Sequence, residues 1–169
     1  MPIIIPDRIF ESYRNITPDF LLSEGVRALI LDIDNTLIPY EEDVPTEELF
    51  RWFSSLRENG ISVALVSNNR KKRLTVFNEN LGFPGYANSC KPLPHNLFRA
   101  MKKMKAKRKE TVMIGDQLFT DMLAARLAGI RSYIVSPIRD KKKFTVRLKR
   151  KLEAPLVRRY YRKEAKKNG

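Results

Sequence analysis

Two aspartates spaced two residues apart, Asp32 and Asp34, follow the short apolar run 29–31. An apolar run that ends so abruptly is typical of a buried strand. Residues i and i+2 of an extended chain point to the same side, so both carboxylates can face one site. Burying two like charges together is unfavourable unless a cation or a catalytic role compensates. The spacing therefore suggests a metal-assisted site with a carboxylate nucleophile, although a strand followed by an Asx turn would explain the same residues.

The rest of the chain predicts the scaffold that positions these aspartates. Apolar segments of strand length alternate with segments of helical periodicity, a pattern that indicates βαβ units. The expected fold is an α/β, Rossmann-like three-layer sandwich with a mostly parallel central sheet. The predicted strands are 27–31, 61–66, 86–89, 111–114 and 131–135, and the predicted helices begin at Pro18 and Glu47 or cover 71–81, 95–104 and 121–128.

Three further polar positions fall where predicted strands end. Ser67 follows the second strand, Lys91 follows the third, and Asp116 follows the fourth. Ligands of open parallel sheets bind beyond the carboxyl ends of the strands. These residues can therefore converge with Asp32 and Asp34, although more than eighty positions separate the first from the last.

Four motifs, in this order, resemble the haloacid dehalogenase (HAD) superfamily of phosphohydrolases. They are Asp-x-Asp-x-Thr at 32–36, Ser67, Lys91, and Gly-Asp-x-x-x-x-Asp at 115–121. The extended sequences LDIDNTL, SNN, CKP and GDQLFTD are similar to those of the capless, YqeG-type branch of subfamily IIIA. That branch is related to phosphatidylglycerophosphate phosphatases. The resemblance covers about residues 28–135 and implies a HAD-like fold without a cap.

The resemblance implies a role for each motif residue. Asp32 would attack phosphorus to form an aspartyl-phosphate, and Asp34 would serve first as general acid and then as general base. Ser67 would donate a hydrogen bond to the phosphate, and Lys91 would neutralise charge on it. Thr36 would hold the phosphate or the loop, and Asn68 could instead shape its loop. The residues expected to contact substrate are Thr36, Ser67, Asn68 and Lys91.

A magnesium ion is the implied cofactor. Mg²⁺ prefers oxygen ligands in octahedral geometry. Asp32, the backbone carbonyl of Asp34, and Asp116 would supply three ligands, and water and phosphate would complete the shell. Asp121 would lie in the second shell and orient Asp116 or a bound water.

The composition limits the class of protein. The chain has 169 residues and one cysteine, so an intramolecular disulfide is excluded and a reducing compartment is indicated. No apolar run approaches the roughly 20 residues of a membrane-spanning helix. The expected location is the cytoplasm, with peripheral association at the inner membrane face as an extension.

The positive charge gathers at the carboxyl terminus. The formal net charge is +14, and residues 139–169 contain fourteen Lys and Arg against three acidic residues. We expect a phosphatase domain with its entry segment at 1–138 and a basic helical tail at 139–169. The tail's apolar residues recur every four positions, which is typical of an interfacial helix but equally of a helix packed on the domain. They are Phe144, Leu148, Leu152 and Leu156.

These features lead to one principal function and two alternatives. Only about thirty residues separate Thr36 from Ser67, too few for a cap domain, and an open site favours bulky substrates. The leading hypothesis is a Mg²⁺-dependent phosphomonoesterase that dephosphorylates phosphatidylglycerophosphate at an anionic membrane surface. The alternatives are an RNA- or ribosome-associated basic factor with a secondary phosphatase site, and a soluble phosphometabolite phosphatase. The oligomeric state is left open.

Overall fold

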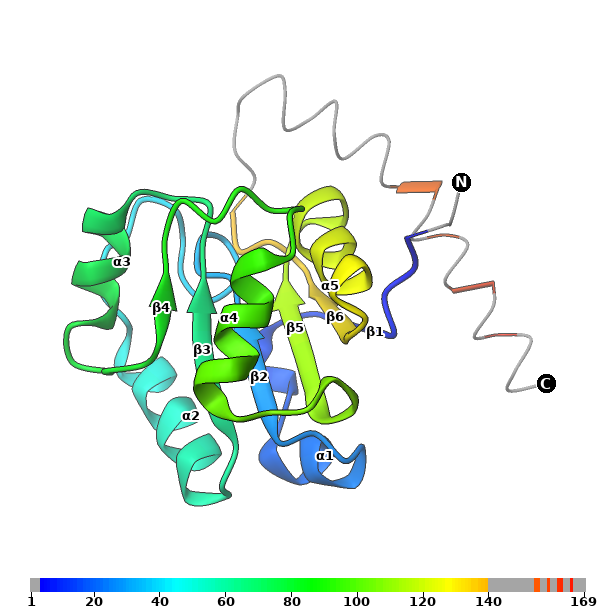
Figure 1. Ribbon diagram of the computed structural model, residues 1–169, viewed down its shortest axis with the longest axis horizontal. Coiled ribbons are helices and arrows are strands. Elements are labelled where there is room, and N and C mark those ends of the chain that lie inside the picture. The colour runs from blue at the N-terminus through cyan, green and yellow to red at the C-terminus, as the bar shows by residue number, and fades with distance from the viewer. Residues whose placement is uncertain (1–3, 140–153, 156–157, 159–160, 163–164, 166–169) are drawn as a thin grey trace.

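The computed structural model describes residues 4–139, 154–155, 158, 161–162 and 165. Helices cover both faces of a central sheet, and the strands point toward the upper side of Figure 1. Apart from Arg139 and the isolated positions after it, the predicted basic tail lies outside the described residues. The division of the chain at residue 138 therefore stays a prediction. No helix among the described residues has both the length and the apolar character needed to cross a membrane.

The sheet contains six strands in the order β1-β6-β5-β2-β3-β4, and every neighbouring pair is parallel. This arrangement confirms the predicted α/β sandwich. The central strand β2 is buried along its whole length because layers of helices cover both of its faces. The strands are β1 (Arg8–Phe10), β2 (Ala28–Leu31), β3 (Ser62–Val66), β4 (Gly85–Tyr86), β5 (Thr111–Gly115) and β6 (Arg131–Val135).

Side-chain alternation along the strands divides the core into two layers. Leu29 and Leu31 of β2 pack in the layer that α1, α2 and α3 cover. Ile30, between them, packs in the layer that α4 and α5 cover. Each strand thus holds helices on both faces, as period-two alternation requires. The helices are α1 (Pro18–Ser23), α2 (Glu47–Glu58), α3 (Lys71–Asn78), α4 (His95–Met104) and α5 (Leu123–Ala128), with short turns at Tyr13–Asn15, Arg108–Glu110 and Leu118–Met122.

Local sequence signals account for several helix boundaries. The Thr17 and Thr46 side chains accept hydrogen bonds from backbone N–H groups in the first turns of α1 and α2. Such caps satisfy donors that have no partner inside the helix. Pro18 occupies the first position of α1, where its missing N–H costs nothing. These two helix starts and the whole of α4 match the prediction.

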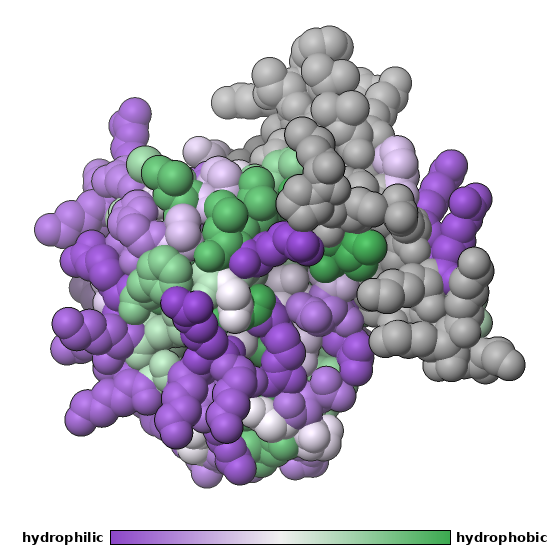
Figure 2. All heavy atoms as spheres, turned by 45° about the vertical axis from the view of Figure 1, so that its right-hand side comes forward, coloured by the Kyte–Doolittle hydropathy of each residue, from purple (hydrophilic) through white to green (hydrophobic). Residues whose placement is uncertain are grey.

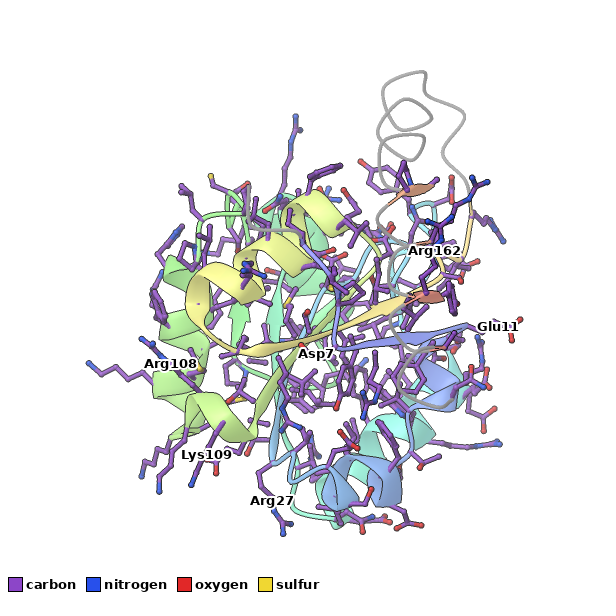
Figure 3. All side chains as sticks on the ribbon, turned by 90° about the vertical axis from the view of Figure 1, so that its right-hand side faces the viewer. Asp7, Glu11, Arg27, Arg108, Lys109 and Arg162 are labelled. Carbon is purple, nitrogen blue, oxygen red and sulfur yellow. The ribbon has the colours of Figure 1, made fainter. Side chains whose placement is uncertain are left out.

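Four elements differ from the prediction, and one of them is α3, which ends at Asn78 and not at residue 81. The strand β1 was not expected, because its three residues are defined only by pairing with β6. Asp7 anchors that pairing: its backbone N–H donates to the Ser132 carbonyl, and its carboxylate accepts from the Ser132 N–H (Figure 3). The strand β4 is shorter than expected, and the last helix begins earlier, in a π-helical turn at Leu118–Met122.

The single tryptophan joins α2 to the segment before α1. The Trp52 indole N–H donates to the Ile16 carbonyl at 2.8 Å, and the indole ring lies 5.1 Å from the Tyr13 ring. A buried indole with a satisfied N–H contributes both apolar area and orientation. This contact fixes the entry segment against α2.

Candidate active site

The motif residues gather at the carboxyl edge of the sheet. Asp32 directly follows β2, Ser67 follows β3, and Asp116 follows β5. Lys91 reaches the same place from the connection between β4 and α4. Parallel neighbours put all of these strand ends on one edge, as the strand order predicts.

Five buried side chains form an inner cluster. The Lys91 Nζ lies 2.7 Å from the Asp32 Oδ1 and 2.7 Å from the Asp121 Oδ1. The Thr36 hydroxyl lies 3.3 Å from the Asp32 Oδ2 and 3.3 Å from the Asp116 Oδ1. Three carboxylates and one ammonium therefore share a site with little access to water. The inner cluster comprises Asp32, Thr36, Lys91, Asp116 and Asp121.

Burial dominates the electrostatics of the inner cluster. Burial raises the pKa of the Asp32 carboxyl from 3.8 to about 6; Lys91 opposes the rise and Asp121 adds to it. For Lys91, burial alone would lower the pKa, but the charges of Asp121 and Asp32 outweigh it and hold the pKa above its usual value. Lys91 therefore stays protonated, and the carboxylates remain short of positive charge.

This shortage of positive charge is what a divalent cation would correct. One oxygen from each of Asp32, Asp116 and Asp121 lies within 4.8 Å of the others, and all three residues are buried. Carboxylate oxygens are hard ligands of the kind that Mg²⁺ binds. The donor set therefore fits a hard divalent cation, with Asp121 grouped beside the two predicted ligands. The assignment of Asp121 to a second shell stays a prediction.

Gly115 makes room for Asp121. A Cβ atom added at Gly115 would stand 2.5 Å from the Asp121 Cγ, closer than real contacts allow. The Asp121 Oδ2 accepts a hydrogen bond from the Gln117 backbone N–H at 3.1 Å, whereas the Asp121 Oδ1 contacts Lys91. Because Gly115 has no side chain, Asp121, the last aspartate of the same motif, can lie close to β5.

The remaining predicted residues occupy different depths. Ser67 is buried, and its hydroxyl accepts a hydrogen bond from the Asn69 N–H at 3.0 Å. The Asn68 side chain accepts from the Lys91 N–H at 2.7 Å and donates to the Lys91 carbonyl at 3.2 Å. This pairing joins Asn68 to the Lys91 loop, and because Asn68 also lines the cleft over the aspartates, its role as a substrate contact stays a prediction.

Asp34 belongs to a separate, outer cluster, defined as Asp34, Asp43, Asn69 and Arg73. The Arg73 Nε donates to the Asp34 Oδ1 at 2.6 Å, and the Asn69 amide donates to the Asp34 Oδ2 at 3.0 Å. A second Arg73 nitrogen donates to the Asp43 Oδ1 at 2.6 Å. No role was predicted for Arg73 or for Asn69, although Asn69 is the last residue of the SNN motif. The available signal was position, since both follow Ser67 closely and Arg73 lies in the first turn of α3.

A cleft of about 230 Å³ opens over the two clusters. Tyr40, Gln117 and Thr120 line it together with the aspartates, and none of the three was predicted. Arg73 stacks over the Tyr40 ring at 5.5 Å, so the outer cluster also fixes one wall. Residues 32–46 and 67–84 contain no inserted domain, which leaves the cleft open among the described residues.

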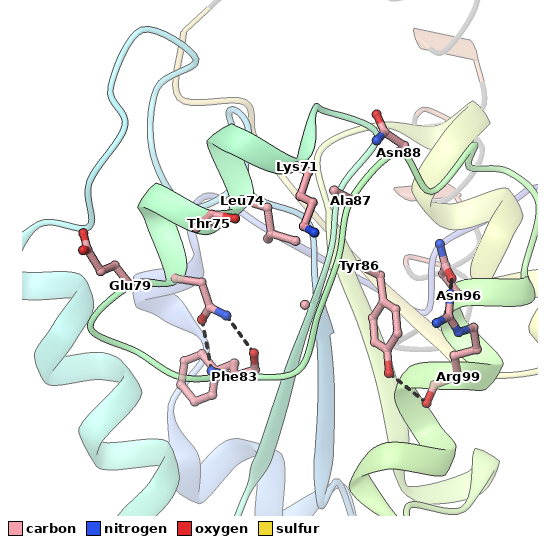
Figure 4. Close-up of a pocket in the computed structure, with 12 residues that line it drawn as sticks. Lys71, Leu74, Thr75, Glu79, Phe83, Tyr86, Ala87, Asn88, Asn96 and Arg99 are labelled. Atoms are coloured by element: carbon pink, nitrogen blue, oxygen red, sulfur yellow. Dashed lines mark hydrogen bonds between the residues drawn. The ribbon is translucent and has the colours of Figure 1, made fainter.

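A larger hollow of about 720 Å³ lies elsewhere, between α3, β4 and α4 (Figure 4). Lys71 and Leu74 line it from α3, and Asn96 and Arg99 line it from α4. Tyr86 donates its hydroxyl hydrogen bond to the Arg99 carbonyl at 3.2 Å. None of the motif residues lines this hollow, so size alone does not locate the chemistry.

Comparison with known proteins agrees with this geometry. Residues 18–129 match the family model for haloacid dehalogenase-like hydrolases. The chain belongs to this family. It is also 35% identical over 153 residues to the probable phosphatase YqeG of Bacillus subtilis, covering 90% of this chain and 89% of that one. The predicted HAD-family phosphatase is thereby confirmed.

Solved structures share the HAD fold. The cobalt-bound deoxy-D-mannose-octulosonate 8-phosphate phosphatase of Haemophilus influenzae superposes with a TM-score of 0.54 at 18% identity, covering 65% of this chain and 68% of that one. An uncharacterized protein of Listeria monocytogenes superposes with a TM-score of 0.53 at 17% identity, covering 70% and 85%. At such identities the likeness concerns the fold alone.

Proposed function

We propose that this HAD-family phosphatase is a Mg²⁺-dependent phosphomonoesterase that works through an aspartyl-phosphate on Asp32. The observation that supports it most is the inner cluster, where Asp32 lies beside Lys91 and within reach of two further buried carboxylates. Asp32, Asp116 and the backbone carbonyl of Asp34 would hold the ion, with Asp121 beside them. When bound, the ion would neutralise charge on the carboxylates and the phosphate.

The chain's own residues supply the remaining chemistry. An oxygen of Asp32 attacks phosphorus while the bond to the leaving oxygen breaks, and Asp34 gives that oxygen a proton. Asp34 then accepts a proton from water as water attacks phosphorus and the Asp32–phosphorus bond breaks. Lys91 and Ser67 stabilise the negative oxygens of the phosphoryl group, and Thr36 holds Asp32 in position.

For the substrate we propose a lipid phosphate, phosphatidylglycerophosphate. The open cleft leaves space for a bulky leaving group, because the described residues include no inserted cap domain between the motifs. The net charge of +14 favours an anionic surface as the place of reaction. The likeness of the motifs to the YqeG-type branch points to the same substrate.

Measurements of phosphate release test both the metal-dependent chemistry and the lipid substrate. Phosphatidylglycerophosphate in anionic mixed micelles would be compared with a soluble aryl phosphate, each with Mg²⁺ and with EDTA. We expect faster release from the lipid and loss of both activities in EDTA. Turnover of the aryl phosphate alone would retain the chemistry and exclude the lipid, whereas activity that persists in EDTA would overturn the metal assignment.

A further inference from the structure

Exposed apolar side chains lie on the loops at the carboxyl edge of the sheet, where the cleft opens. Tyr40, Leu93 and Ile138 have 45%, 56% and 38% of their surface exposed. All three lie on connections that follow the carboxyl ends of strands, after β2, β4 and β6. Figure 2 shows apolar residues in the upper half of the molecule, toward which the strands point in Figure 1, and others near its lower end. Single exposed apolar residues are ordinary, but a group around one opening indicates contact with an apolar phase.

Backbone hydrogen bonds tie two of these residues to the active-site loops. The Ile138 N–H donates to the Asn35 carbonyl at 2.9 Å, one residue from Asp34. The Leu93 N–H donates to the Cys90 carbonyl at 3.0 Å, which closes a turn around Lys91. Tyr40 itself lines the cleft. The apolar mouth is therefore held in a fixed position relative to the inner cluster.

Exposed cations lie near the cleft, beside acidic side chains that are held in ion pairs. Arg70 and Lys72, at the start of α3, are exposed. The acidic side chains of the loop after Tyr40 share two arginines: Asp43 pairs with Arg73, and Glu41 and Glu42 both pair with Arg139, which offsets part of their charge. Cations near an anionic leaflet add to the binding of apolar side chains that enter the interface.

The opposite edge of the sheet provides a contrast. Arg27, Arg108 and Lys109 precede β2 and β5 and extend outward there (Figure 3). That edge is also cationic, so charge alone does not distinguish the two edges of the sheet. Leu127, near the end of α5, has 53% of its surface exposed there, close to the value for Leu93. The two leucines form a matched pair, one at the mouth and one remote from it.

We propose that the mouth formed by Tyr40, Leu93 and Ile138 docks on an anionic phospholipid bilayer, with the cleft facing the headgroups. This inference rests on the proposed function, because a lipid phosphate reaches Asp32 directly in that orientation. It adds a surface on the catalytic domain itself, independent of the basic tail. The apolar side chains enter the interface, while Arg70 and Lys72 lie against anionic headgroups.

Vesicle binding by the full-length protein tests the surface. Flotation would use phosphatidylcholine vesicles with and without phosphatidylglycerol, and the variants Leu93→Ser/Ile138→Ser and Leu127→Ser. Removing two inserted apolar side chains should lower the partition coefficient on anionic vesicles at least about tenfold. Leu127→Ser should stay within about twofold of wild type. Hydrolysis of a soluble aryl phosphate should be unchanged in both variants, which shows that the fold and the chemistry persist.

Any other outcome would contradict the proposed membrane-docking surface and leave the phosphatase assignment unchanged. Equal losses in the two variants, or none, would place membrane binding elsewhere on the chain. Binding to RNA with no binding to vesicles would assign the cations to a nucleic acid. In the converse direction, Asp32→Asn should bind vesicles as wild type does, so loss of turnover with intact binding would concern the proposed function alone.

Discussion

Asp32 of the inner cluster and Asp34 of the outer cluster lie two residues apart after the same strand, β2, yet the surroundings of their carboxylates differ. Asp32 is enclosed, and its partners are one lysine and one threonine hydroxyl. Asp34 lies nearer the surface and accepts a hydrogen bond from Arg73, which also donates to Asp43 on a neighbouring loop. A nucleophile benefits from a fixed, dehydrated position, whereas an acid–base group must exchange protons with water. The difference teaches that one Asp-x-Asp motif can supply both environments.

Asp32→Asn should break the inner cluster most severely. An amide cannot form the aspartyl-phosphate, so we expect kcat for an aryl phosphate to fall more than about 10⁴-fold. The fold should persist, because the substitution removes a buried charge and keeps the side-chain shape. Phosphate release and thermal unfolding measure the two effects. Activity within tenfold of wild type would contradict the nucleophile assignment.

Asp116→Asn should abolish the response to metal. Mg²⁺ bound to the native state raises Tm by mass action, so the increase seen in wild type on adding Mg²⁺ after EDTA should disappear. Activity should fall at least about 100-fold, because charge on the phosphate is no longer neutralised. Differential scanning calorimetry with and without Mg²⁺ measures the shift. Asp19→Asn, in the first turn of α1, is the control and should keep the full increase.

Arg73→Gln should weaken the outer cluster and leave the inner one intact. We expect a loss in kcat of about 10- to 100-fold, because Asp34 and the Tyr40 wall lose their common anchor. The loss should be greater for an alkyl phosphate, whose leaving oxygen needs a proton, than for an aryl phosphate. Arg73→Lys should recover only part of the loss, since one ammonium cannot hold both carboxylates in the same geometry.

Equal losses for the alkyl and aryl substrates would contradict a positioning role for Arg73 and indicate a general structural one. The control is Arg51→Gln, which removes an exposed ion pair with Glu47 on α2. Exposed pairs of this kind contribute little to stability. We therefore expect Arg51→Gln to stay within about twofold of wild type on both substrates.

The smallest expected effect is a pH dependence of stability in the metal-free protein. Burial raises the pKa of the Asp32 carboxyl from 3.8 to about 6, so between these values the native state binds more protons than the unfolded state. The free energy of unfolding contributed by Asp32 must then fall as pH rises through that window. Urea unfolding in EDTA, compared between wild type and Asp32→Asn, measures it. A difference that grows with pH in favour of wild type would contradict the sign.

Much of the fold could be predicted because its signals are local. Thr17 and Thr46 cap helices within three residues of themselves, and α4 carries its own periodicity. The missed elements depend on distant partners. Three residues of β1 become a strand only beside β6, and the π-helical turn at Leu118–Met122 is defined by its place between β5 and α5.

The same distinction between local signals and distant partners applies to the candidate site. The convergence of Asp32, Lys91 and Asp116 could be predicted, because the strand order of a parallel sheet brings their positions to one edge. Arg73 could not be predicted, because its role arises from a helix face that meets another loop. Its type is common in this basic chain, so only the contact with Asp34 in the folded structure distinguishes it.

The position of Trp52 has a practical consequence. As the only tryptophan in the chain, it gives intrinsic fluorescence a single source. It contacts Tyr13, Phe53 and the Ile16 carbonyl, and it lines neither the cleft nor the larger hollow. Emission should therefore follow detachment of the entry segment from α2 and stay constant as metal or phosphate is added. The protein thus contains an optical reporter of its unfolding that is separate from its chemistry.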